Sequence, residues 1–322
     1  MTALTTTATV VEAAGPSSRK ARKAPAALWA VGAIVVVPAA VPIAYLVWSV
    51  VRPGGIDAGG IPAARLIELS LSTGLLVVAV TVTTTCLGAA TAWLTTHTDL
   101  PGRRVWSTFV TLPLVIPSYV GALALLGASG NRGMISLGLQ GLGLPGLPVF
   151  SGFWAAWAAL SLWNFSFAHL LAVPALRRMD PALEEAARGM GASRAKTMAT
   201  IVLPQLRPAL TGAALLVALY VLSDFGAVSL LRYETFTRAI YSQFRGRLDV
   251  TPAIFLSGML VIIALVLIVL EQRTRGSAEL HAGRPPRSPR PVGLSPGGRA
   301  AAVTFLGLLV AAALVVPLVT LA

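Results

Sequence analysis

The sequence predicts an all-α polytopic membrane protein with six membrane spans and a seventh span at its C-terminal end. Of the 322 residues, 56% are hydrophobic and 11% are charged, whereas soluble domains contain about 25% charged residues. The hydrophobic residues gather in seven runs, each long enough to cross a bilayer as a helix. The Lys and Arg residues are divided unevenly, with 18 in the segments on one side of these runs and 7 on the other.

This charge distribution also predicts the orientation of the chain. Lys and Arg concentrate in the cytoplasmic segments of membrane proteins, so we expect the N-terminus in the cytoplasm. Residues 1–25 are rich in Thr and Ala and end in four basic residues, which predicts a disordered cytoplasmic tail. The net charge of +13 does not indicate nucleic-acid binding, because the basic residues flank hydrophobic runs instead of forming one face.

The first two spans are expected at residues 28–51 and 69–94. The first contains two prolines, which a membrane helix tolerates when its neighbours satisfy the freed backbone groups. The second carries six threonines and two glycines, a composition that favours close helix packing over a polar pore lining. It also carries Cys86, the only cysteine, so no intrachain disulfide can form. We expect Cys86 to be a buried, unreactive thiol.

The third span, residues 105–128, contains Pro113 and Pro117. Two prolines four residues apart predict a broken helix, which transporters use around their pathways. The stretch 129–150 that follows is rich in Gly and Pro and is expected to be an external loop.

The fourth and fifth spans, residues 152–176 and 209–231, contain the polar residues most relevant to a transport pathway. Asn164 and His169 lie deep in the fourth span, where such residues more often form hydrogen bonds between helices than bind a substrate. Asp224 lies in the outer third of the fifth span. An ionisable residue within a span is a pathway candidate by default. The alternative is a hydrated carboxylate at the outer membrane interface.

The remaining chain is expected to add one more span to this domain, then a linker and the seventh span. Residues 232–250 are aromatic and charged and predict an external, interfacial helix, and residues 252–270 form the sixth span. The six-span domain therefore covers residues 26–272. A Pro- and Arg-rich cytoplasmic linker, residues 273–299, follows it, with the seventh span at residues 300–322. The triplet Val316-Pro317-Leu318 echoes Val41-Pro42-Ile43 of the first span, so we interpret the seventh span as the start of a second half.

Residues 179–208, called the coupling segment below, form the longest charged, helix-forming stretch between hydrophobic runs. Asp180 followed by Pro181 is a favourable helix start, with a capping side chain and a residue whose missing N–H costs nothing there. Gly189 and Gly191 allow a sharp turn, and a second short helix is expected over residues 193–202. A helix, a glycine turn and a second helix of this kind are suited to docking into a partner's groove.

The spacing within the coupling segment resembles the EAA loop of binding-protein-dependent ABC importer permeases. The residues that carry this resemblance are Glu185, Ala186, Ala187, Gly191, Ile201, Leu203 and Pro204. Two further runs, LPLVIPSYVGALALL in the third span and SDFGAVSLLRYETFTRAIYSQF after the fifth, are similar to the ferric-iron-type branch of that family.

The resemblance implies that the coupling segment contacts a separate ATP-hydrolysing subunit on the cytoplasmic side of the cell inner membrane. On this basis Glu185 would make a polar contact with the ATPase, and Ala186 would allow close approach. Gly191 would form a turn too tight for a side chain, and Leu203-Pro204 would fix the start of the fifth span. The implied partners are ABC ATPase subunits, an extracytoplasmic substrate-binding protein, a second permease half and membrane lipid. The arginines of residues 232–247 would either contact an acidic lobe of that binding protein or form a solvated surface.

The resemblance implies ferric iron or an iron complex as the substrate, although permeases for thiamine, phosphonate, polyamine and sulfate share the same loop. An ATP-independent channel or carrier, or a membrane scaffold, is the alternative of another class. The sequence has no GxxxxGK[ST] motif, so it predicts no ATP site and no enzymatic activity of its own. Its three histidines lie far apart, so we expect no metal site and no bound cofactor, with ATP on the partner subunit.

Overall fold

The computed structural model describes residues 26–51, 60–130, 133–179, 181–246, 250–274 and 291–321. The chain divides into two units, Met1–Gly55 and Ile56–Ala322. The described part of the first unit is a single helix, α1 (Ala26–Val51), with Pro38 and Pro42 inside it. This helix coincides with the expected first span. The expected N-terminal tail and most of the expected linker lie outside the described residues.

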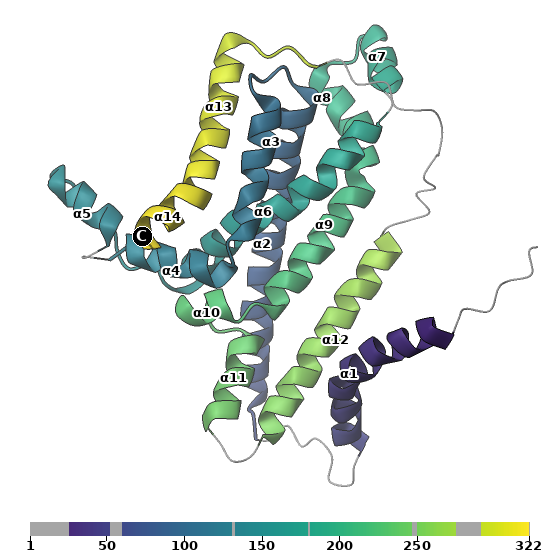
Figure 1. Ribbon diagram of the computed structural model, residues 1–322, viewed down its shortest axis with the longest axis vertical. Coiled ribbons are helices and arrows are strands. Elements are labelled where there is room, and N and C mark those ends of the chain that lie inside the picture. The colour runs from purple at the N-terminus through teal and green to yellow at the C-terminus, as the bar shows by residue number, and fades with distance from the viewer. Residues whose placement is uncertain are drawn as a thin grey trace, which may run out of the picture. The chain divides into compact units, whose positions relative to one another are not determined.

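The described residues of the second unit are helical, apart from connecting turns and one isolated backbone bridge between Thr98 and Val292. In chain order (Figure 1) its elements are α2 (Ala63–His97), α3 (Arg103–Thr111), the 3₁₀ turn η1 (Leu112–Val115), α4 (Ser118–Ala128), α5 (Met134–Gly141), α6 (Gly152–Arg178), α7 (Pro181–Gly189), α8 (Arg194–Thr197), the π turn η2 (Met198–Val202), α9 (Leu203–Ser223), α10 (Gly226–Leu230), α11 (Phe236–Gly246), α12 (Thr251–Thr274), α13 (Pro296–Val310), the π turn η3 (Ala311–Val315) and α14 (Val316–Leu321).

Five helical stretches among the described residues are long and apolar enough to cross a membrane, and a sixth is present if a bent pair counts as one span. All of these lie in the second unit. The helix α1 of the first unit contains a further apolar stretch, Val36–Ser49. The all-α, multi-span fold class is therefore confirmed.

The bent pair is the expected broken span. The stretches Arg103–Val115 and Ser118–Ala128 meet at an angle of 92°. Pro117 forces the residue before it out of the helical conformation, and Ile116 accordingly has φ −87° and ψ 115°. Pro113 lies in the tighter turn η1 just before the break. The two prolines thus produce the break that their spacing predicts.

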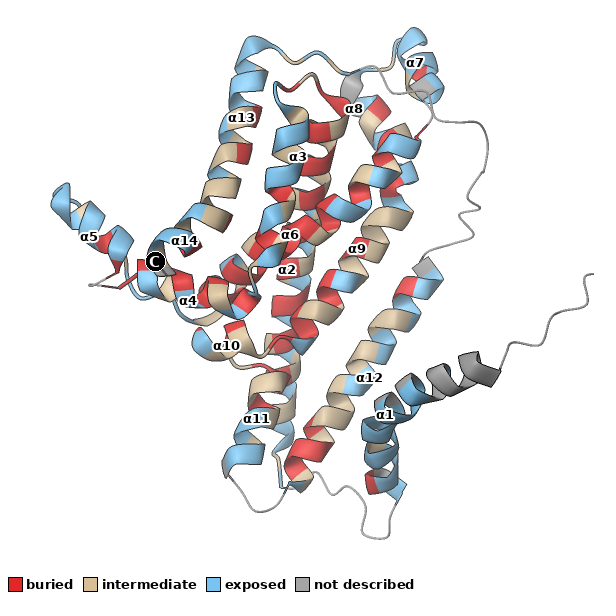
Figure 2. Cartoon of the chain, in the orientation of Figure 1, coloured by how far each residue is buried: buried red, intermediate tan, exposed pale blue. Residues whose placement is uncertain are grey.

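The central helix of the second unit is α6. Of its most apolar 18-residue window 61% is buried, against 33% or less for the other four long spans. Figure 2 shows buried residues along α6 and along the faces of α2 and α9 that pack beside it. The two helices α2 and α6 come close at Gly88 of α2, where an added Cβ would overlap Ala168 Cβ and the backbone of His169. This position therefore requires glycine for packing, as the composition of the second span suggests.

Three expectations about the second unit are wrong. The fifth span starts and ends early, because the helical stretch Met198–Ser223 runs through Pro208 and stops before Asp224. The external stretch 129–150 contains a helix, α5, in addition to loop. Cys86 is exposed on the outside of α2, because the helix turns its small and threonine-bearing face toward α6 instead. The expected helix in residues 232–250 is present as α11.

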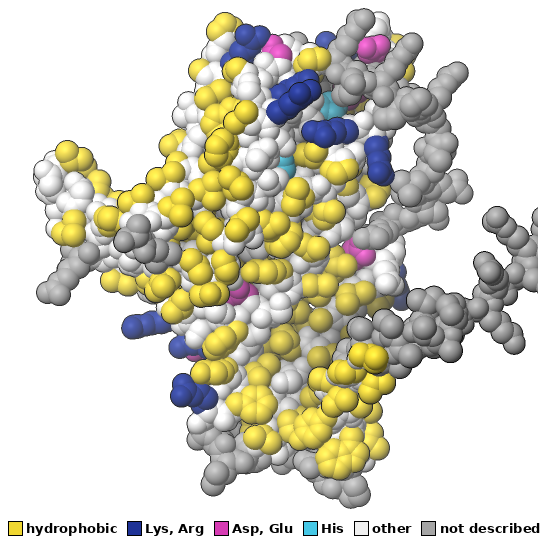
Figure 3. Space-filling model, in the orientation of Figure 1, with side chains coloured by type: hydrophobic (Ala, Val, Ile, Leu, Met, Phe, Trp, Pro, Cys, Tyr) yellow, Lys and Arg dark blue, Asp and Glu magenta, His cyan; other side chains and the backbone are white. Residues whose placement is uncertain are grey.

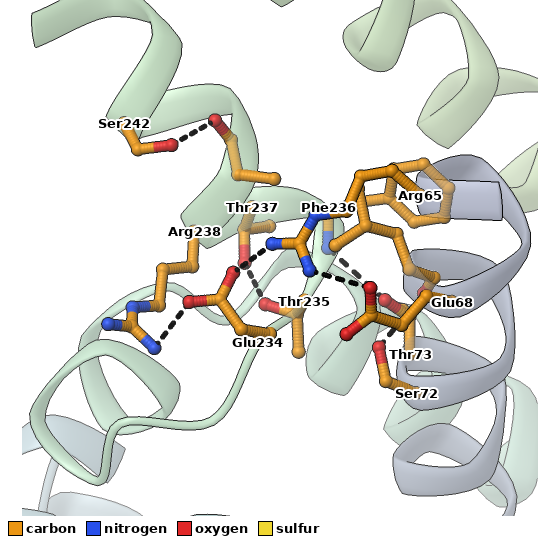
Figure 4. A network of polar contacts seen from close by, with 12 residues as sticks. Arg65, Glu68, Ser72, Thr73, Glu234, Thr235, Phe236, Thr237, Arg238 and Ser242 are labelled. Carbon is orange, nitrogen blue, oxygen red and sulfur yellow. Dashed lines mark hydrogen bonds and ion pairs between the residues drawn. The ribbon is translucent and has the colours of Figure 1, made fainter. Parts of the chain in front are cut away.

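A polar network fixes α11 against the beginning of α2 (Figure 4). Arg65 donates to Glu68 at 2.9 Å and to Glu234 at 3.0 Å, and Arg238 pairs with the other oxygen of Glu234 at 2.7 Å. The Phe236 amide, at the start of α11, donates to Thr73 Oγ1 at 3.1 Å. Exposed pairs of this kind each contribute little stability, but several together fix an orientation. Arg238 therefore forms an intramolecular ion pair that is part of the fold.

The seventh helical stretch packs on the broken span and on α6. Trp163 Nε1 of α6 donates to the carbonyl of Ala313 at 3.0 Å, and Leu306 is fully buried in the same cluster. Ala313 lies in the π turn η3, which ends two residues before Pro317. The other π turn, η2, likewise ends two residues before Pro204. Because proline lacks an N–H and crowds the carbonyl four residues earlier, a local π turn lets the helix continue through it.

Candidate functional site

The coupling segment forms a helix, a turn and a second helix at one end of the second unit (Figure 1). The first helix is α7 and the second is α8, which continues through η2 into α9. This arrangement confirms the expected order of elements. The expected cap, Asp180, lies outside the described residues. At Leu203-Pro204 the helix returns from the π geometry of η2 to the α geometry of α9. The fifth span begins earlier, at Met198.

Gly191 ends α7 in a Schellman motif. Its φ is +84°, its amide donates to the Arg188 carbonyl at 3.0 Å, and the Ala192 amide donates to the Ala187 carbonyl at 3.0 Å. This six-to-one and five-to-two pairing needs a left-handed residue, which glycine adopts without strain. An added Cβ would meet nothing within 4 Å. The expectation of a turn is confirmed, but the reason for glycine is its backbone conformation and not a lack of space.

The residues that carry the motif lie on different faces of this segment. Glu185, Ala186, Leu203 and Pro204 are exposed, Ile201 is half-buried, and Ala187 is buried. Two apolar residues outside the motif, Leu183 and Met190, are also exposed on this segment, and the sequence pattern does not single them out; Met190 is 83% exposed.

Glu184 and Glu185 are neighbours in sequence but differ in exposure. Glu185 is exposed, whereas Glu184 faces inward with its Oε1 3.7 Å from Nε2 of the buried His97, at the end of α2. Burial raises the pKa of the Glu184 carboxyl, and the nearby Arg188 lowers it by a smaller amount. Glu184 thus lies against the end of α2, and Glu185 is exposed on the surface.

The surface around the coupling segment is basic. On the face seen in Figure 3, Lys and Arg side chains gather toward the end with α7 and α8 and in a second group at the lower left, and hydrophobic side chains dominate the surface between the two groups. This separation is expected for helices that pass from a bilayer into water.

The structure places His169 and Asn164 in the interior of the helix bundle. His169 Nδ1 lies 3.0 Å from Thr91 Oγ1 of α2, and its Nε2 lies 3.4 Å from Ser107 Oγ of α3. His169 therefore joins three helices. Asn164 Nδ2 donates to the Leu160 carbonyl of its own helix at 2.7 Å, so this contact joins no second helix.

Asp224 lies where two interrupted helices meet. Its carboxylate accepts from Ser118 Oγ, the first residue of α4, at 2.5 Å and from the Ala227 amide of α10 at 3.0 Å. Its backbone carbonyl accepts from Thr237 Oγ1 at 2.8 Å. At 8% exposure it is not the hydrated carboxylate of the alternative interpretation. Asp224 thus connects the second arm of the broken span to the turn after α9.

The described residues contain no cluster of three or more His, Cys, Asp or Glu side chains that could hold a metal ion. The motif residues of the coupling segment and the three interior polar residues, Asn164, His169 and Asp224, form separate groups.

Comparison with known proteins identifies the family to which this chain belongs. The model of the family described as "Binding-protein-dependent transport system inner membrane component" matches residues 84–273. The Fe(3+)-transport system permease protein FbpB 2 of Haemophilus influenzae is 33% identical over 221 residues, which cover 68% of this chain and 40% of that protein. The sulfate transport system permease protein CysW of Synechococcus elongatus is 25% identical over 261 residues, covering 78% of this chain and 89% of that protein. This chain thus spans less than half the length of the iron permease.

The fold is similar to solved structures as well. A chain of a bacterial ABC transporter involved in the import of the acidic polysaccharide alginate superposes with a TM-score of 0.63 at 17% identity. The superposition covers 79% of this chain and 96% of that chain. At this identity the likeness concerns the fold alone.

Proposed function

Because this chain belongs to the family of binding-protein-dependent transport system inner membrane components, we propose that it is a transmembrane permease subunit of an ABC importer. The observation that carries this proposal is the exposed helix–turn–helix of the coupling segment, at one end of a bundle of membrane-spanning helices. Such a bundle performs no chemistry itself. It moves a solute by changing between conformations that a partner favours in turn.

The partner at the coupling segment is an ABC ATPase subunit, which binds and hydrolyses the ATP. Glu185 offers this subunit a charged contact, and Ala186 allows its backbone to approach closely. Ala187 is buried and Ile201 is half-buried, so both face the rest of the unit, while Leu203 and Pro204 are exposed. Gly191 sets the angle between the two helices. On the other side of the membrane, an extracytoplasmic binding protein delivers the substrate.

A second permease half, fused to this chain or separate, completes the pathway. The seventh stretch, α13 to α14, is the start of such a half, and the residue echo between its Val316-Pro317-Leu318 and Val41-Pro42-Ile43 supports this proposal. The remaining outer surface contacts membrane lipid. The N-terminus lies in the cytoplasm, as the uneven distribution of Lys and Arg indicates.

The proposed substrate is ferric iron or an iron complex, which the likeness to the iron permease supports. The second candidate is sulfate, because the sulfate permease is similar over more of this chain at lower identity. Thiamine, phosphonate and polyamine are further alternatives. An ATP-independent carrier or scaffold would need no docking helix for an ATPase.

A mild-detergent pull-down of the tagged protein from its own host tests this function directly, with proteomics and metal analysis of the eluate. Recovery of an ABC ATPase with an iron-loaded binding protein would support the importer and its substrate together. An ATPase with a metal-free binding protein would keep the importer and replace iron with an organic or anionic solute. Well-folded protein that recovers no ATPase would contradict the docking role of the coupling segment.

The orientation is testable with a single engineered thiol. In a Cys86→Ser background, a cysteine at Lys196, which is exposed on α8, is expected to resist a membrane-impermeant maleimide in intact cells and to react after permeabilisation. A cysteine at Arg245, exposed on α11, is the matched position expected to react in intact cells. Labelling of the Lys196 position in intact cells would overturn the orientation.

Asp224 is the pathway candidate that the geometry favours, since it connects two interrupted helices. Asp224→Asn keeps the size of the side chain and removes its charge, so we expect lower substrate uptake at normal expression. Ser118→Ala removes only the hydroxyl that Asp224 accepts from and is expected to have a smaller effect. Unchanged uptake kinetics in Asp224→Asn would leave this residue with a structural role alone.

A further inference from the structure

A short segment near the end of the expected linker is held against the turn between α2 and α3. Val292 forms a parallel bridge with Thr98: its amide donates to the His97 carbonyl at 2.7 Å, and its carbonyl accepts from the Asp99 amide at 3.2 Å. The paired residues are almost two hundred positions apart in the sequence. Residues 291–295, called the strap below, are therefore an ordered part of the second unit.

Asp99 fastens the strap to the seventh helical stretch. Its Oδ1 accepts from the Leu294 amide at 2.9 Å, and its Oδ2 pairs with Arg299 in the first turn of α13. Arg299 and the Leu294 amide both lower the pKa of the Asp99 carboxyl, which is therefore ionised at neutral pH. Ser295, the last residue of the strap, caps α13 by accepting from the Gly298 amide at 3.1 Å. The strap runs directly into α13, so the two must move together.

The same turn contacts the coupling segment on its other side. The His97 ring, whose backbone carbonyl holds the strap, lies 3.7 Å from Glu184 of α7. A pocket of about 290 Å³ separates α7 from the strap, with Glu184 and Arg188 among its lining on one side and Val292 and Leu294 on the other. Residues 97–99 thus bind the strap by hydrogen bonds and contact α7 through the His97 ring.

We propose that residues 97–99 are positioning residues for transport, which pass a displacement of α7 through the strap to α13. This proposal rests on the proposed role of α7 as the ATPase-docking helix. Beyond α13 the contacts continue, because Ala313 accepts a hydrogen bond from Trp163 of α6, and α14 packs on α4 of the broken span. ATPase movement at α7 of the first half therefore reaches the helix that begins the second half without crossing the interior of the bundle.

The test uses the complete complex of permease, ATPase and binding protein in proteoliposomes, with solute moved per ATP hydrolysed as the readout. Asp99→Ala removes the acceptor for the strap and is expected to lower this ratio by about fivefold, the lower range of coupling effects between two sites. Recovery of the ATPase with the permease should stay unchanged. Asp99→Asn keeps an oxygen acceptor for the Leu294 amide and loses only an exposed ion pair, so it should stay close to the wild-type ratio.

An unchanged ratio in Asp99→Ala would overturn the proposal, and so would an equal loss in Asp99→Asn. Failure of the wild-type permease to retain an ATPase would instead contradict the docking role of α7, so the two failures are distinguishable. A second measurement does not depend on transport. In a Cys86→Ser background, cysteines at Thr98 and Val292 are expected to cross-link equally well in the resting and vanadate-trapped complexes. Cross-linking in one state alone would mean that the strap detaches, which the proposal forbids.

Discussion

Gly88→Leu is expected to destabilise the folded helix bundle severely. Gly88 lies where α2 meets α6, and even one added carbon would overlap Ala168 Cβ and the backbone of His169. Neither obstacle can swing aside, because one is a methyl group on a buried helix and the other is main chain. The two helices would have to separate. Overpacking of this kind costs about 3 kcal/mol at the upper end of the usual range.

The measurement is the midpoint of thermal unfolding in detergent, followed by tryptophan fluorescence. Gly74→Leu is the matched control, since Gly74 lies on the same helix and an added Cβ there meets nothing within 4 Å. We expect a clear drop in midpoint, or loss of monodisperse protein, for Gly88→Leu and little change for Gly74→Leu. Equal midpoints for the two variants would show that α2 and α6 do not pack at Gly88.

Gly191→Val is expected to have the largest effect on function while leaving the protein inserted in the membrane. A residue with a side chain at φ +84° costs roughly 1–2 kcal/mol, and more when the side chain is β-branched. Relief of that strain would break the Schellman motif and change the angle between α7 and α8. The ATPase would then hydrolyse ATP without a matched response in the bundle.

Substrate stimulation of ATPase activity in the reconstituted complex measures this effect. We expect Gly191→Val to lose the stimulation and Gly191→Asn to keep most of it, because Asn tolerates the left-handed conformation best among residues with a side chain. Gly189→Ala is the control: Gly189 is the last residue of α7, its φ is not positive, and an added Cβ there meets nothing. Normal stimulation in Gly191→Val would contradict a coupling role for the turn.

The sequence predicted the spans well because the bilayer imposes a length and a composition that can be read locally. Pro113 and Pro117 likewise predicted the broken span, since proline acts on its own helix. The start of the fifth span was predicted too late, because Arg207 and Pro208 resemble a boundary, although both lie inside the helix α9. The boundary depends on backbone hydrogen bonding, which hydropathy does not report.

The candidate site was predicted only in part, because the sequence reports local residue types but not contacts between distant segments. The glycine turn and the two short helices follow from local residue types. The inward orientation of the Glu184 side chain, in contrast, brings it into contact with His97, a residue nearly ninety positions earlier. The strap could not be predicted at all. Its sequence is that of a linker, and only pairing with Thr98 and Asp99 gives it a fixed position.

The burial of α6 has a consequence for how the chain enters the bilayer during synthesis. Its best window has a mean hydropathy of 1.4, the lowest of the five long spans, against 3.2 for α12. Polar groups carry a cost in the hydrocarbon core until they find partners. Those of His169 and Ser166 find theirs on α2 and α3, at Thr91, Ser107 and the Val110 carbonyl. These helices precede α6 in the chain, so they have already left the ribosome when α6 emerges. When α6 leaves the translocon it can therefore pack directly against α2 and α3, whereas α12 is apolar enough to partition into lipid unaided.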